Sequence, residues 1–130
     1  DESLRFTMNK DGNDLFSGGT FENLHYLKTD WGDESEGAAS DYHKLFRGAH
    51  SCCRVVNESL PDGKSIIITC DSMVIPWMPI LCCYFREVVL LDNRDGKSHA
   101  EYYEDKEFDY AIVQFWEGRD ITKPLSENLI

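Results

Sequence analysis

At 130 residues, the chain is long enough to bury one hydrophobic core but short for two domains of ordinary size. Its composition, 42% hydrophobic and 28% charged, is typical of a globular protein, and its apolar runs are too short to cross a bilayer. A formal net charge of −11 argues against nucleic acid or an anionic membrane as the main partner. We therefore expect one acidic domain spanning residues 1–130.

The N-terminal residues 1–23 carry the weakest pattern of the chain. Asp11-Gly12 and Gly18-Gly19 indicate turns, and short segments such as Leu4–Met8 are compatible with strands. We expect an irregular region here, followed by the core of the domain over residues 24–130.

The next segment predicts a strand, a helix and a second strand. Asn23–Lys28 has the composition of a short strand, and Glu36–Arg47 places apolar residues at helical spacing. Cys52–Val56 is compatible with another strand, and the Pro-Asp-Gly sequence within Asn57–Lys64 predicts a turn.

A buried strand and a buried helix are predicted from residue 65 onward. Ser65–Cys70 is a continuous, mostly β-branched run, which is typical of a strand covered on both faces. Pro76 and Pro79 suit the first turn of a helix that continues through Phe85. That helix is apolar almost all round, so we expect it to be buried, with Trp77 in the core.

The last third of the chain repeats the alternation of strand and helix. Glu87–Leu91 predicts a second buried strand, His99–Lys106 a helix capped by Ser98, and Tyr110–Phe115 a third strand. Strand–helix–strand–helix–strand at this spacing predicts an α/β fold with a parallel sheet and right-handed crossovers.

Five cysteines are present, an odd number that includes two adjacent pairs, so they do not form the pattern of a disulfide framework. Cys70, Cys82 and Cys83 lie inside apolar runs and are expected to be buried. Cys52 and Cys53 follow His50 without CxxC or HxxxH spacing, so no metal site and no cofactor is predicted.

Polar side chains follow the three C-terminal strands at the points where they end. In a parallel sheet these ends share one edge, where ligands and catalytic groups gather. The residues are Asp71 and Ser72 after the first strand, Asp92 and Asn93 at the second, and Gln114, Trp116, Glu117 and Arg119 at the third.

Ser72 occupies the turn between a strand and a helix, where a nucleophile would sit. Backbone N–H groups of the following turn are expected to stabilise an oxyanion. The structural alternative is that Asp71-Ser72 only caps the helix.

Two stretches, "SIIITCDSMVIPWMPILCCYFREVVLLDNRD" and "FDYAIVQFWEGRDI", resemble the end of SGNH-hydrolase-like proteins of the DHHW family, relatives of alginate O-acetylation proteins. Upstream, "YLKTDWGDESEGAASDYHKLF" is similar to that family's Thr-Asp-His-His-Trp segment and the Gly-Ala that follows it. The resemblance covers about residues 25–120. It implies a three-layer α/β sandwich of SGNH or flavodoxin type, with a small, mostly parallel sheet and helices on both faces.

The resemblance also implies site residues. Ser72 matches the family nucleophile, and Asp30 matches the acid that orients the catalytic histidine. The histidine itself is missing, because Gly32 occupies its position, and Cys70 replaces the glycine before Asp-Ser. Among the four histidines, His25, His43, His50 and His99, the substitute base with the best placement is His43. A serine without a base is a poor nucleophile, so the sequence favours a weakened or inactive relative.

Three functions follow from these observations. The first is an acyl esterase or O-acetyltransferase acting on envelope or secreted glycans, outside the cytoplasm, as the resemblance implies. The second is a non-catalytic module that binds glycans or proteins, with Trp31 and Trp116 beside the presumed cleft. The third is a fragment of a larger enzyme that supplies only part of a cleft.

Overall fold

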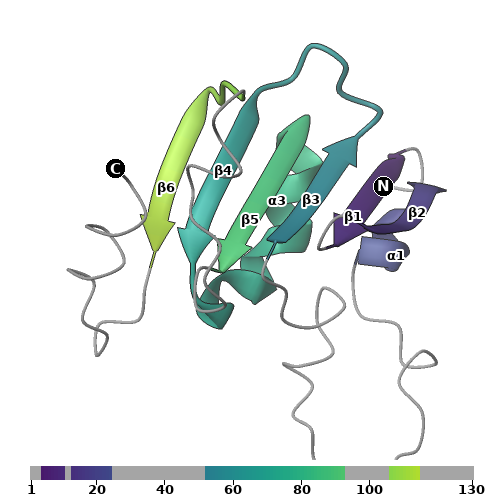
Figure 1. The fold of residues 1–130 in the computed structure, drawn as a ribbon. Helices are drawn as coiled ribbons and strands as arrows, with labels where there is room; N and C mark the ends of the chain where they lie inside the picture. Colours follow the sequence, from purple (N-terminus) through teal and green to yellow (C-terminus); the bar gives the residue numbers. More distant parts are fainter. Residues whose placement is uncertain (1–3, 11–12, 25–51, 93–105, 115–130) are drawn as a thin grey trace, which may run out of the picture.

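The computed structural model describes residues 4–10, 13–24, 52–92 and 106–114, with Ser72 described through its backbone. Within this part six strands form a single sheet, in the order β2-β1-β3-β5-β4-β6 (Figure 1). The strands are β1 (Phe6–Lys10), β2 (Asn13–Gly19), β3 (Cys52–Asn57), β4 (Ser65–Cys70), β5 (Glu87–Asp92) and β6 (Tyr110–Gln114). No helix among these residues has the length and hydrophobicity needed to cross a membrane.

The sheet is mixed rather than mostly parallel. β4 pairs in parallel with β5 and with β6, which confirms the parallel arrangement predicted for the C-terminal strands. The other three pairings, β1 with β2, β1 with β3, and β3 with β5, are antiparallel. The prediction of a mostly parallel sheet was wrong for two reasons: β1 and β2 form a hairpin, and β3 runs antiparallel to both of its neighbours, β1 and β5.

That hairpin occupies the region predicted to be irregular. β2 pairs with β1 through two register shifts, and Gly18 takes a positive φ of 65° at the first of them. Such bulges break the alternation of buried and exposed residues that identifies a strand in a sequence. A short helix, α1 (Phe21–Leu24), follows β2, so Asn23 and Leu24 are helical rather than part of the predicted strand Asn23–Lys28.

A helical segment connects β4 to β5 in two parts. A 3₁₀ helix, η3 (Ser72–Trp77), is followed directly by the α-helix α3 (Met78–Tyr84). Pro79 lies in the first turn of α3, as predicted, whereas Pro76 lies inside η3. Proline lacks an N–H group, which favours a short first segment over one continuous α-helix.

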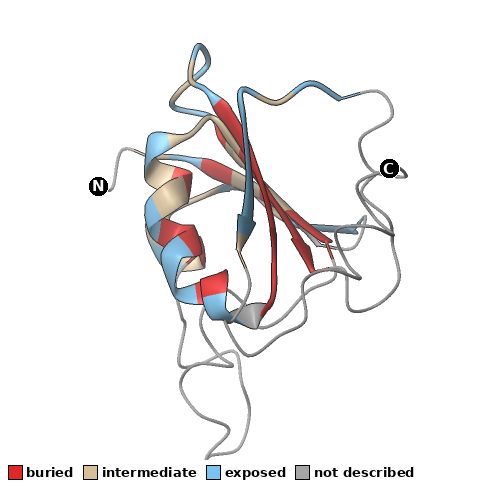
Figure 2. Ribbon diagram, turned by 90° about the vertical axis from the view of Figure 1, so that its left-hand side faces the viewer, coloured by how far each residue is buried: buried red, intermediate tan, exposed pale blue. Residues whose placement is uncertain are grey.

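The segment buries one side only. Val74, Ile75, Met78 and Cys82 face the sheet. The opposite side carries four exposed apolar residues at helical spacing, which we call the outer stripe: Met73, Trp77, Ile80 and Tyr84, with 51%, 66%, 57% and 75% of their surface exposed. Figure 2 shows this outer side in pale blue. The predictions that the helix is buried all round and that Trp77 belongs to the core were therefore wrong.

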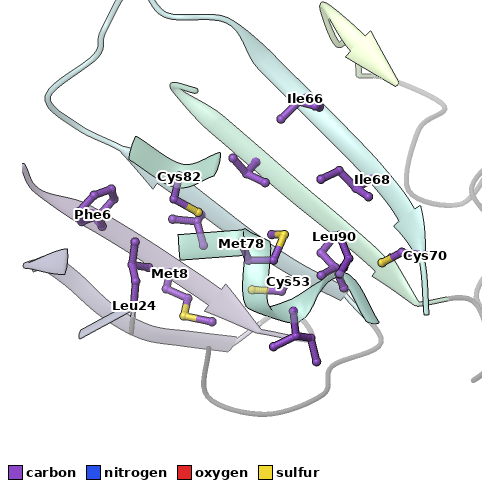
Figure 3. Packing of buried hydrophobic residues seen from close by; sticks show 14 residues of the cluster. Phe6, Met8, Leu24, Cys53, Ile66, Ile68, Cys70, Met78, Cys82 and Leu90 are labelled. Carbon is purple, nitrogen blue, oxygen red and sulfur yellow. The ribbon is translucent and has the colours of Figure 1, made fainter. Parts of the chain in front are cut away.

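The hydrophobic core has two clusters, one on each face of the sheet. The larger lies between the sheet and the helices and includes Phe6, Met8 and Leu24 from the N-terminal region and Met78 and Cys82 from α3 (Figure 3). The smaller, on the opposite face, is formed by four buried residues with Phe108 packed against them: Cys52, Ile67, Val89 and Leu91.

The described helices pack on a single face of the sheet (Figure 2), so this part of the chain is a strand-rich α/β structure rather than a sandwich with helices on both faces. The helix predicted over Glu36–Arg47 and nearly all of the one over His99–Lys106 lie outside the described residues.

None of the five cysteines, all of which lie within the described residues, forms a disulfide bond. Cys52, Cys53, Cys70 and Cys82 are buried, and Cys83 is partly buried. Burial raises the pKa of the Cys82 thiol well above its ordinary value, which keeps that thiol neutral and unreactive.

Asn57, at the end of β3, ties the sheet to the end of α3. Its buried side chain donates from Nδ2 to the Cys82 carbonyl, at 3.0 Å, and accepts from the Ser59 N–H, also at 3.0 Å. The carbonyls of a last helical turn lack partners within the helix, so this amide satisfies one of them. The contact fixes where α3 ends relative to β3.

Candidate functional site

The carboxyl ends of β5, β4 and β6 lie side by side at one end of the sheet, toward which their arrows point downward in Figure 1. The register places Cys70 of β4 beside Asp92 of β5 on one side and beside Gln114 of β6 on the other. This is the edge at which the sequence predicted a site. β4 is the middle strand of the three, and all six of its residues are buried.

Asp71 follows β4 directly and begins the turn into η3. Its backbone is extended, with φ −101° and ψ −174°, and its side chain is buried. Oδ1 accepts a hydrogen bond from the Met73 N–H at 2.9 Å, and the Asp71 carbonyl accepts one from the Val74 N–H at 3.4 Å. Asp71 therefore caps η3, a role that the sequence indicated for the Asp71-Ser72 pair.

Ser72 is the first residue of η3, as the sequence predicted for the strand-to-helix turn. The same turn was expected to offer backbone N–H groups to an oxyanion. Those of Met73 and Val74 are already bonded to Asp71, so an oxyanion would have to displace one of these contacts to use them.

Asp92 and Gln114 flank this turn. Asp92 ends β5 and is buried. Gln114 ends β6 and is partly buried, and its Oε1 is a buried acceptor that has no hydrogen-bond partner among the described residues. From the sequence, Gln114 was only one of several polar residues at a strand end. Whether its amide finds a hydrogen-bond partner depends on which residues surround it in the folded protein.

A separate polar cluster holds β6 to β4 at the other end of these strands, where both begin. Asp109, just before β6, accepts hydrogen bonds from Lys64 Nζ at 2.8 Å, from the Ser65 N–H at 2.8 Å and from Ser65 Oγ at 3.1 Å. The hydrogen bond with the Lys64 ammonium, followed by that from the Ser65 N–H, lowers the pKa of Asp109 to about 2. This cluster was not predicted from the sequence, although a charged residue immediately precedes both β4 and β6 and could have indicated it.

The remaining predicted site residues lie outside the described residues and stay predictions. They are Asp30, Trp31, His43, Asn93, Trp116, Glu117 and Arg119. The other three histidines, His25, His50 and His99, lie outside them as well. The structure thus places the strand edge and the Asp71-Ser72 turn of the predicted site.

No protein-family model matches the chain, and no curated protein matches its sequence. Solved structures do share its fold. A DHHW family protein from Eubacterium siraeum superposes with a TM-score of 0.55 at 14% identity over 86% of this chain. PatB1 from Bacillus cereus superposes with a TM-score of 0.59 at 14% identity in a structure with a sulfonyl adduct, and with 0.57 at 16% identity in another, each over 88% of this chain.

The matched part spans only 35–36% of those longer chains. At such low identities the likeness shows the fold. The chain therefore has an α/β fold that a DHHW family protein and PatB1 also contain, which confirms the fold relationship expected from the sequence.

Proposed function

We propose that this chain carries the nucleophile-bearing part of an acyl-transfer fold, with Ser72 as the nucleophile and an O-acylated glycan as the substrate class. The observation that carries the proposal is the position of Ser72, directly after the middle strand of the parallel group and at the start of a helical turn. The fold shared with PatB1 adds support, because PatB1 has been solved with a sulfonyl adduct, and such adducts form on nucleophilic side chains.

The proposed reaction has two half-reactions. Ser72 Oγ attacks the acyl carbonyl while its proton passes to a base, and the tetrahedral oxyanion then collapses. The bond to the donor oxygen breaks, and that oxygen leaves with a proton returned by the base. A hydroxyl of water or of a sugar next attacks the acyl-serine in the same way, which releases Ser72 with its proton and yields a carboxylic acid or a new ester.

The base decides how fast this reaction runs. We propose His43, with Asp30 as the orienting acid, because Gly32 replaces the histidine that the family motif carries. A base recruited from another position is expected to serve less well. Loss of a triad member in serine hydrolases costs about 10⁴-fold in turnover, so we propose an impaired enzyme.

Covalent labelling tests the nucleophile. The protein is incubated with phenylmethanesulfonyl fluoride and its intact mass is measured over time. We expect one adduct, formed slowly, which is absent in Ser72→Ala and retained in Ser59→Ala, a control that removes an exposed serine from a turn. His43→Ala is expected to slow labelling by about 100-fold, the lower range for a general base. No adduct, or one that survives in Ser72→Ala, would rule Ser72 out as the nucleophile.

A second candidate is a non-catalytic module that binds glycans or a protein partner. The exposed ring of Trp77 favours it, since a wide aromatic face open to solvent can stack on a sugar ring. Titrating a panel of neutral glycans while recording tryptophan fluorescence tests this candidate. A shift that disappears in Trp77→Phe supports it, and an unchanged spectrum with every sugar contradicts it.

A third candidate is that the chain supplies part of a larger enzyme. It is supported by the matched solved structures, of whose length the chain spans little more than a third. A longer reading frame around this sequence, with a histidine in the additional part, would support this candidate. A start codon directly before Asp1 would contradict it.

A further inference from the structure

Gln114 has a buried acceptor that the described structure leaves without a donor. Among the buried side-chain nitrogen and oxygen atoms of the described residues, Gln114 Oε1 is the one that makes no hydrogen bond. A buried polar atom without a partner destabilises the folded state, and native proteins retain few of them. The described residues supply no donor for it, so this oxygen is open to a donor from water or from a ligand.

The position of this acceptor is specific to the candidate site. β6 is an edge strand of the described sheet, and its residues Tyr110, Ile112 and Val113 are exposed, as the pale-blue strand in Figure 2 shows. Only at its carboxyl end, at Gln114, does the strand become partly buried. An amide on such an open strand has solvent within reach, yet its oxygen is enclosed at the end nearest the Asp71-Ser72 turn.

The register gives the direction of this side chain. Gln114 is paired with Cys70, and paired residues of neighbouring parallel strands project to the same face of the sheet. Cys70 belongs to the cluster beneath the helices, so Gln114 projects toward the face on which η3 begins. Asp92, on the other side of Cys70, has the same register position on β5.

The charge around this edge restricts the ligand. An amide oxygen accepts hydrogen bonds only, so the ligand must offer a hydroxyl or an N–H group. Asp71 and Asp92 are buried carboxyl residues at the same edge, and the protein as a whole carries a net charge of −11. This acidic environment disfavours phosphate- or carboxylate-bearing ligands. Of the donors that remain, a neutral hydroxyl is the group that the proposed acyl acceptor carries.

We infer that Gln114 is a positioning residue for the acyl acceptor, whose neutral sugar hydroxyl donates a hydrogen bond to Oε1 at the carboxyl end of β6. This inference rests on the proposed function, because it gives a role to the hydroxyl that attacks the acyl-serine. Gln114 orients that hydroxyl beside Ser72 and takes no part in the transfer of protons.

The test compares Gln114→Met, which keeps the length of the side chain and removes the acceptor, with Ile112→Met, a control on the same face of β6. Urea midpoints are measured with and without cellotetraose, a neutral sugar whose only donors are hydroxyl groups. The sugar is expected to raise the midpoint of the wild type and of Ile112→Met. The dissociation constant of the sugar should rise about tenfold in Gln114→Met, as the loss of one hydrogen bond predicts.

A second readout needs no sugar. If Oε1 lacks an internal donor, replacing it by an apolar group leaves the urea midpoint unchanged or raises it. A lower midpoint for Gln114→Met than for Ile112→Met would show an internal partner and overturn the inference. Equal sugar affinity in Gln114→Met and wild type, or no sugar effect in the wild type, would also overturn it.

These equilibrium measurements separate the two proposals. If Ser72 fails to label while the sugar effect depends on Gln114, acyl transfer by Ser72 is refuted and the sugar site remains. If Ser72 labels while Gln114→Met behaves as the wild type, the function stands and the role of Gln114 is refuted.

Discussion

Asp109 and Ser65 bind each other reciprocally at the amino ends of β4 and β6. The carboxylate accepts from the N–H and Oγ of Ser65, and Ser65 Oγ accepts in turn from the Asp109 N–H at 3.1 Å. Lys64 Nζ adds the charge that favours the ionised carboxylate. This cluster fixes the first residue pair of an edge strand, and so sets the register that brings Gln114 beside Cys70 at the far end.

The lowered pKa of Asp109 makes its contribution dependent on pH. The folded-state pKa of about 2 lies below the ordinary value of 3.8, so the stabilisation is complete above about pH 4. It is lost as the pH falls through 2. We therefore expect Asp109→Asn to lower the urea midpoint at pH 7 and at pH 5, and the gap from the wild type to shrink between pH 4 and pH 2.

Asp62→Asn provides the matched control, because it removes the same charge from an exposed turn. It should leave the urea midpoint within experimental error of the wild type at pH 7. A gap between Asp109→Asn and wild type that stays constant down to pH 2 would contradict the proposed origin of the effect.

The helical segment between β4 and β5 has apolar residues on two sides, of which one packs on the sheet and the other is exposed. Equivalent substitutions on the two sides should therefore differ in their effect on stability. Met78 is fully buried against the sheet, whereas Ile80 lies in the outer stripe. We expect Met78→Ala to lower the free energy of unfolding by about 2–5 kcal/mol, since it leaves a cavity in the larger cluster.

Ile80→Ala removes a comparable volume from the opposite side of the same helix. It is expected to change the free energy of unfolding by less than about 0.5 kcal/mol. Both values come from urea unfolding curves at pH 7. Equal losses in the two variants would mean that the outer stripe is packed against another part of the protein.

The strands and the helical segment differ in how well the sequence predicts them. β4 was predicted with its observed bounds because a short, continuous run of β-branched residues strongly favours a buried strand over a helix. Leu4–Met8, which the sequence made compatible with a strand, overlaps β1, whereas β2 was missed because its bulges break the alternation. The burial of the helix was overestimated, since hydrophobicity alone does not say which side a neighbour will cover.

In the candidate site too, features that depend on local sequence were predicted and features that depend on distant neighbours were not. The Asp71-Ser72 turn was predicted because it depends on the local change from strand to helix. The occupied N–H groups of Met73 and Val74 and the orphan oxygen of Gln114 were not, because they depend on backbone torsions and on neighbours across the sheet.

At the scale of the whole molecule, charge and the outer stripe act against each other. A net charge of −11 at pH 7 keeps copies of the protein apart, while four exposed apolar side chains on one helical face favour association. The charge vanishes near the isoelectric point of about 4.6. We expect light scattering to rise steeply as the pH approaches that value, because repulsion is then lost while the stripe is unchanged.

A double variant, Trp77→Gln with Ile80→Gln, isolates the contribution of the stripe without altering the charge. Its scattering near the isoelectric point of about 4.6 is expected to fall several-fold below that of the wild type. Leu15→Gln with Val113→Gln removes two exposed apolar side chains elsewhere and serves as the comparison. Equal scattering from all three proteins would mean that association proceeds through another surface.

The pairing of β1 with β3 has a consequence for synthesis of the chain. Phe6 of β1 lies opposite Asn57 of β3, and Phe6 and Met8 pack in the same cluster as Met78 and Cys82. The hairpin therefore leaves the ribosome long before the residues that bury it. At about 5–20 residues per second, the interval amounts to several seconds, during which two large apolar side chains have no permanent cover. A chaperone that binds nascent apolar segments would have the β1–β2 hairpin available throughout this interval, until α3 has emerged.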